Sequence, residues 1–131
     1  AQSMDNPVWY IQYAHARCCS IFRQAEAAGI SSDAWDTADL ALLEEPGELD
    51  LVRKMAAFPD EVLSAAIERA PSRIAKYGLD LASLFHSFYN ECRVMGDDPA
   101  LTAARLALVD AAKTVIANAL NIMGIAAPER M

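Results

Sequence analysis

Residues 99–123, PALTAARLALVDAAKTVIANALNIM, set the architecture expected for this chain. Apolar side chains recur there at intervals of three and four residues and cover much of a helical circumference. One stripe consists of Leu101, Ala104, Leu108, Ala111, Val115 and Ile122, with Leu106, Val109, Ile116 and Leu120 beside it. A helix that is apolar on so many sides is typical of the centre of a bundle, so we expect it to be buried against helices over residues 7–28 and 71–94.

The first of these partner helices is marked at both ends. Asn6 is a favourable N-cap, and Pro7 fits the first helical position, where its missing N–H costs nothing. Gly29 suits the C-terminal cap. Residues 30–39 follow as a polar connection, from which we expect Trp35 to fold back onto the bundle.

Prolines open three further helices, expected over residues 46–57, 59–69 and 71–94. Gly78 interrupts the last of them and weakens its helical pattern. No segment alternates apolar and polar residues for long enough to predict a strand. Five helices with short connections predict an all-α bundle, and a length of 131 residues predicts a single domain over residues 1–131.

The net charge of −7 argues against a nucleic-acid partner until its distribution is considered. Nine acidic and only two basic residues lie between Asp33 and Glu61, a difference equal to the whole net charge. We expect this acidic block to be a solvated face, and its functional alternative is repulsion that keeps RNA away from that side. The rest of the chain is neutral overall and can present Arg17, Arg93 and Arg130 without a prevailing negative field.

Composition narrows the class of protein further. No apolar run reaches the ~18–20 uncharged residues that a membrane helix needs, and residues 1–7 do not resemble a secretion signal. Three cysteines, two of them adjacent, fit free thiols in a reducing compartment, so we expect a cytoplasmic protein. His15 and Cys19 are four residues apart, but two ligands do not make a metal site. We therefore expect no catalytic residue, no metal and no cofactor within this chain.

Two tyrosines and an arginine share one face of the first expected helix. Tyr10, Tyr13 and Arg17 are spaced i, i+3 and i+7, beside the apolar stripe of that helix rather than within it. Aromatic rings with an arginine are what a surface needs to stack unpaired bases and hold a phosphate. The alternative is that the tyrosines are boundary packing residues with their hydroxyls in water. The spacing leaves both interpretations open.

A second cluster lies near the end of the helix expected over residues 71–94. Because Phe88 belongs to its apolar stripe, Tyr89 falls about 100° around the helix, and Arg93 at i+4 shares the face of Tyr89. Asn90 is adjacent, and its amide can read a base edge while the arginine pairs with a phosphate. The alternative is again boundary packing. Two such clusters on helices that pack together favour a shared surface for single-stranded RNA.

The residues after the last expected helix form a short tail, GIAAPERM, at residues 124–131. Chain ends usually fray. This one is stiffened by Pro128 and keeps apolar residues up to Met131, so we expect it to dock on the bundle.

Four segments, taken together, resemble one known family. They are DNPV at residues 5–8, YIQYAHAR at 10–17, FYNECRV at 88–94 and APERM at 127–131. In this order they resemble the C-terminal anticodon-binding domain of arginyl-tRNA synthetase, an α-helical bundle of the DALR type carried by class Ia synthetases. The resemblance covers essentially the whole chain. The signatures of the class I catalytic domain are absent, so we expect a domain excised from a larger synthetase.

This resemblance implies which side chains contact the tRNA anticodon loop. They are Tyr10, Tyr13, Arg17, Tyr89, Asn90, Arg93 and Met131. Asn6 lies with Asp5 and Pro7 in a stretch that resembles a family loop reshaped when tRNA binds. Gly78 departs from the family, because a larger apolar residue is expected at that position.

The resemblance also implies the partners. They are arginine tRNA and the catalytic domain of the same enzyme, which would bind ATP and arginine, and no membrane is involved. The alternative is a helical protein-interaction module that docks another protein through the acidic block or the apolar surface of the last helix.

Overall fold

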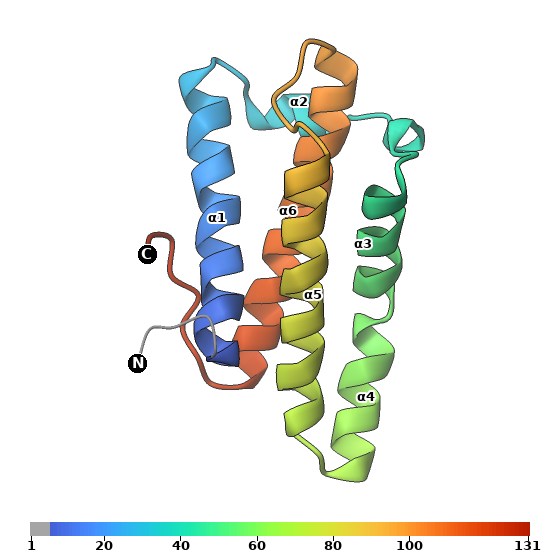
Figure 1. The fold of residues 1–131 in the computed structure, drawn as a ribbon, viewed down its shortest axis with the longest axis vertical. Helices are drawn as coiled ribbons and strands as arrows, with labels where there is room; N and C mark the ends of the chain where they lie inside the picture. Colours follow the sequence, from blue (N-terminus) through green and yellow to red (C-terminus); the bar gives the residue numbers. More distant parts are fainter. Residues whose placement is uncertain (1–5) are drawn as a thin grey trace.

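The computed structural model describes residues 6–131, and every regular element within them is a helix (Figure 1). The elements are α1 (Pro7–Ala27), α2 (Ser32–Asp36), a 3-10 turn η1 (Leu40–Leu42), α3 (Pro46–Ala56), α4 (Phe58–Glu68), α5 (Ser72–Glu91) and α6 (Pro99–Ile122). The all-α bundle expected from the sequence is confirmed. Over the same residues, no helix combines the length and the hydrophobicity needed to cross a membrane.

The connection between α1 and α3 is more structured than expected. It contains α2, so the described part of the chain has six α-helices rather than five. The indole of Trp35, on α2, packs against Phe22 of α1 with ring centroids 5.1 Å apart, which confirms that Trp35 folds back onto the bundle. A short helix satisfies the backbone hydrogen bonds of a segment held in this way.

The central position predicted for α6 is confirmed. It packs against α1, α2, α3 and α5, and Figure 1 shows α1 on one side of α5 and α3 with α4 on the other. The large apolar side chains of α6 that are fully buried are Leu106, Val109, Ile116 and Leu120. The stripe named first from the sequence is partly wrong, because Ala111 lines an open groove beside α3 and Ile122 an open hollow beside α4.

The end of α5 differs from the sequence-based expectation. The helix stops at Glu91, and Cys92 has an extended backbone with φ −117° and ψ 124°. Cys92 and Val94 are buried while Arg93 between them is exposed. This alternation is the period-two pattern of an extended segment, which brings both apolar side chains to the core. The prediction that Arg93 shares a helical face with Tyr89 is therefore wrong.

A close contact between α1 and α5 explains the glycine inside α5. A methyl group on Gly78 would lie 2.9 Å from Cδ1 of Ile11, whose side chain is fully buried. Glycine in a helix interior costs about 1 kcal/mol relative to alanine, and α5 nevertheless continues through Gly78. The family resemblance called for a larger apolar residue there, but Ile11 supplies that apolar volume from the neighbouring helix.

We predict that these two positions are energetically coupled. Ile11→Val removes Cδ1 and should lower the free energy of unfolding by about 0.5–1.5 kcal/mol in the parent chain. In a Gly78→Ala background the same change should cost less or should stabilise, because the new methyl group uses the space of Cδ1. Urea unfolding of the four variants, followed by circular dichroism, measures the coupling. Additive effects would show that Gly78 does not serve this contact.

The acidic block is not a uniformly solvated face, so that prediction is wrong for Glu48. Its side chain is completely buried, because its carboxylate has partners inside the bundle. It accepts the N–H of Glu45 at 3.0 Å, in a capping box at the start of α3. Its other oxygen lies 2.6 Å from Nε of Arg105 on α6. Removing one partner of such a buried pair costs about 3–5 kcal/mol, so the pair fastens α3 to α6.

Candidate nucleic-acid interface

Aromatic side chains from α1 meet a histidine from α5 at the edge of the helix contact. The rings of Trp9 and Tyr13, one helical turn apart, stack with centroids 5.3 Å apart and planes 4° from parallel. Tyr10 and Tyr13 both contact His86, with centroid distances of 5.1 and 5.5 Å. Both tyrosines are half-buried, so they combine the two roles that the sequence left open: they pack at a boundary and they present a surface.

Arg17 joins the two clusters predicted from the sequence. Its Nη2 donates a hydrogen bond to the hydroxyl of Tyr13 at 2.8 Å. Its guanidinium carbon lies 4.7 Å from the ring centroid of Tyr89, within the range of a cation–π interaction. An arginine held between two tyrosines restrains both rings, so Arg17 positions the α1 and α5 clusters relative to each other.

The C-terminal tail docks along α1, as predicted from its apolar residues (Figure 1). Three side chains of α1 donate to its main-chain carbonyls: Gln12 to Ala126 (3.0 Å), His15 to Pro128 (2.8 Å) and Arg23 to Glu129 (3.2 Å). Because the acceptors are carbonyl oxygens, the tail is held chiefly through donors on α1. Gly124, at φ +72°, makes the turn that ends α6 and directs the tail back along α1.

Docking of the tail completes a hollow of about 310 Å³, which we call the tail hollow. Its lining includes Tyr13, Arg17, Arg23, Tyr89, Arg130 and Met131. The side chain of Met131 is about half exposed, with a relative accessibility of 52%. The fold thus brings together four predicted site residues from α1, α5 and the tail.

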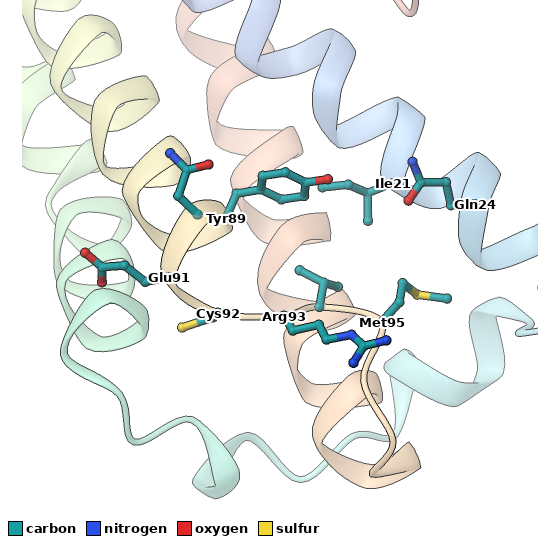
Figure 2. Close-up of a pocket in the computed structure, with 9 residues that line it drawn as sticks. Ile21, Gln24, Tyr89, Glu91, Cys92, Arg93 and Met95 are labelled. Carbon is teal, nitrogen blue, oxygen red and sulfur yellow. The ribbon is translucent and has the colours of Figure 1, made fainter.

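A second hollow, of about 420 Å³, lies beside the last turn of α5. Figure 2 shows Tyr89 reaching from α5 toward Ile21 and Gln24 of α1, with Arg93 on the segment that follows α5. Asn90 also lines this hollow. Tyr89 borders both hollows, so Asn90 and Arg93 lie next to the tail hollow although they do not line it.

Asn6 has a structural role at the start of α1. Its side-chain oxygen accepts the N–H groups of Val8 and Trp9 at 3.0 and 3.4 Å, which confirms the predicted N-cap. The cap lies at the opposite end of α1 from Arg23. Asp5, which the sequence groups with Asn6, lies outside the described residues.

His86 of α5 packs among these rings with one ring nitrogen unsatisfied. Its Nε2 atom is buried and has no hydrogen-bond partner. The imidazole lines a hollow of about 250 Å³ together with Tyr10, Tyr13 and Asn90. Burial, with a smaller contribution from the charge of Arg17, lowers the pKa of His86 from its ordinary 6.5 to about 4. The ring at the centre of this surface is therefore neutral at pH 7.

We predict that His86 makes the fold sensitive to acid. Because the pKa is lower in the folded chain, the unfolded chain binds the extra proton more readily between pH 6.5 and 4. The contribution of His86 to stability is complete above pH 6.5 and is lost as the pH falls toward 4. His86→Phe keeps a ring without a titrating group, so its free energy of unfolding should fall less than that of the parent over this range. The prediction would be contradicted if urea unfolding showed that the free energy of unfolding falls equally in the parent and in His86→Phe.

Sequence reasoning missed Trp9 and Arg23, and it named Arg130 as an arginine away from the acidic block without placing it at this surface. Trp9 lies four residues before Tyr13, so helical spacing was a signal that could have placed it. Arg23 and Arg130 had no such signal, because only the docked tail brings them to one hollow. Within residues 6–131 no group of three or more His, Cys, Asp or Glu side chains is arranged to hold a metal ion.

A helical bundle whose surface hollow is lined by tyrosines, arginines and a methionine has the side chains of a single-stranded RNA-binding module. The chain belongs to the DALR anticodon binding domain family, whose family model matches residues 11–131. This match extends over almost all of the helices described above.

Relatives and solved structures agree with this family. The chain is 54% identical over 130 residues to an arginine–tRNA ligase of Symbiobacterium thermophilum and 53% identical to one of Caldanaerobacter subterraneus, covering 99% of this chain and 23% of each relative. Thermus thermophilus arginyl-tRNA synthetase superimposes with a TM-score of 0.80 at 36% identity, over 93% of this chain and 21% of that one. A putative arginyl-tRNA synthetase of Campylobacter jejuni gives a TM-score of 0.88 at 33% identity, over 100% and 28%. The chain therefore spans about a quarter of the length of the proteins it matches.

Proposed function

We propose that this chain is the anticodon-binding domain of an arginine–tRNA ligase and binds the anticodon loop of arginine tRNA. The observation that carries the proposal is the tail hollow, on which Tyr13, Arg17, Tyr89 and Met131 converge. Aromatic rings, a thioether and a guanidinium around one concavity suit an unpaired base and its neighbouring phosphate. The relatives named above indicate that the amino acid is arginine, because they are arginine–tRNA ligases.

The chemical steps of the reaction would take place in the catalytic domain of such an enzyme, outside this chain. The full enzyme would attach arginine to the tRNA with ATP, and both small molecules would bind its catalytic domain. This chain would supply recognition and no catalytic group, with the catalytic domain as its second partner. Its free cysteines, Cys18, Cys19 and Cys92, fit action in the reducing cytoplasm.

The genetic code makes a single fixed pocket sufficient for recognition. Every arginine codon has G in the middle, so every arginine anticodon has C there, while the first anticodon base varies. Each base stacked on an aromatic side chain contributes about 1–3 kcal/mol. Because the guanidinium of Arg17 covers one face of Tyr89, a base that stacks on that face takes the place of the guanidinium.

The remaining predicted residues would extend the contact beyond the tail hollow. Tyr10 would add a ring on the α1 side, and Asn90 with Arg93 would continue the surface past the end of α5. Asn6 would act indirectly, because it caps the helix that carries Tyr10.

We predict that the ring of Tyr89 is needed for aminoacylation but not for arginine activation. In the full enzyme, Tyr89→Ala should lower kcat/KM for aminoacylation of arginine tRNA by about 5- to 150-fold, the equivalent of one lost stacking contact. ATP-dependent activation of arginine should be unchanged. Tyr89→Phe keeps the ring and serves as the matched control, with near-parental aminoacylation. Normal aminoacylation by Tyr89→Ala would remove Tyr89 from the site.

We also predict that binding depends on the middle anticodon base. In an electrophoretic shift assay with the full enzyme, arginine tRNA transcripts with C replaced at that position should lose most of their affinity. A transcript changed at a base pair in the anticodon stem is the control and should bind normally. Equal binding of all transcripts would instead favour a helical module that docks protein partners.

A further inference from the structure

The arginines of this chain differ in whether they pair with a carboxylate. Those on α3, α5 and α6 form ion pairs with carboxylates: Arg53, Arg73 and Arg105. Five arginines take part in no ion pair found in the described chain: Arg69 at the end of α4, Arg93 after α5, and Arg17, Arg23 and Arg130 on α1 and the tail. The three on α1 and the tail lie on one side of this acidic protein, where their unpaired charges favour a local positive potential.

The same three arginines line the tail hollow. The contacts that hold two of them are with neutral groups. Arg17 donates to the Tyr13 hydroxyl and lies over the Tyr89 ring, and Arg23 donates to the carbonyl of Glu129. Neutral partners fix the position of a guanidinium without cancelling its charge, so this hollow is suited to an anion.

We propose that Arg23 and Arg130 form a binding site for one backbone phosphate of single-stranded RNA, at the rim of the tail hollow. The inference rests on the proposed function and extends it, because it assigns the phosphate beside the recognised base to two residues outside the predicted base contacts. Guanidinium groups present paired N–H donors that match phosphate oxygens. Arg17 already contacts two tyrosines, and Arg23 and Arg130 add two further guanidinium groups that can neutralise the backbone.

The place of Arg130 in the tail supports this assignment. It precedes Met131 directly, so a base in contact with Met131 would carry its own phosphate close to Arg130. Arg130 is exposed and Arg23 half-exposed, and both line the tail hollow. Tail docking would thus build the phosphate site and the base site together.

A phosphate contact has a signature that base contacts lack. It releases counterions, so the logarithm of the association constant falls with the logarithm of salt concentration, with a slope of about −0.7 per phosphate for single strands. A phosphate contact also carries no sequence information. Its loss therefore lowers the affinity for loops with the recognised base and for loops without it by the same factor.

The test measures this slope with the 131-residue chain and a fluorescently labelled anticodon stem-loop of arginine tRNA. Anisotropy titrations over a series of NaCl concentrations should show that Arg23→Gln with Arg130→Gln reduces the magnitude of the slope by about 0.7. The double variant should lower the affinity for stem-loops with C in the middle position and for those with another base there by the same factor. Arg130→Gln alone leaves the bond from Arg23 to Glu129 intact, and it should also reduce the slope.

Two variants serve as matched controls. Arg53→Gln removes an exposed arginine that is paired with Asp50 on α3, and it should leave the slope unchanged. Tyr89→Ala should weaken binding without changing the slope. Replacing single loop phosphates with neutral methylphosphonates should identify one position at which the double variant has no further effect, which separates an RNA phosphate from a general anion site.

The outcomes distinguish the two proposals. Intact RNA binding with an unchanged slope in both Arg130→Gln and the double variant overturns the phosphate site alone. A reduced slope for Arg53→Gln as well would overturn it too, because the effect would then reflect net charge rather than this hollow. Failure of the parent chain to bind the stem-loop at any salt concentration would overturn the proposed function and the phosphate site together.

Discussion

The close approach of α1 and α5 at Gly78 is the constraint on which the surface depends. Because Gly78 has no side chain, Ile11 fills the space beside it and the two helices lie against each other. The same approach brings Tyr13 and Arg17 within contact distance of His86 and Tyr89, about two to three helical turns further along. A wider separation would leave two isolated aromatic patches rather than one surface.

The second constraint is the way polar groups are satisfied on each side of the bundle. Glu48 and Arg105 neutralise each other where α3 meets α6, so their charges hold these two helices together. On the α1 side, tyrosine hydroxyls and main-chain carbonyls hold Arg17 and Arg23 without neutralising them. A protein with a net charge of −7 can therefore keep one surface compatible with a polyanion.

Local signals were sufficient for much of this architecture. The cap at Asn6, the prolines that open helices and the apolar periodicity act over a few residues, and the structure contains the helices that they predict. The errors arose where a distant segment decided the outcome. α5 ends at Glu91 because Cys92 and Val94 are drawn into the core, and Glu48 is buried because Arg105 lies opposite. A distant segment also sets the environment of His86, since rings from α1 lie against it and its Nε2 has no hydrogen-bond partner.

The sequence by itself determined the helical class, the position of α6 at the centre and, through four short segments, the resemblance to a family. It also placed Tyr10, Tyr13 and Arg17 on one face, because helical spacing is a local property. Only the tertiary structure decided that Tyr89, Arg130 and Met131 join that face around one hollow. The reason is that the tail returns along α1 through bonds from side chains to main-chain carbonyls, which pair residues more than 100 positions apart and leave no periodic pattern in the sequence.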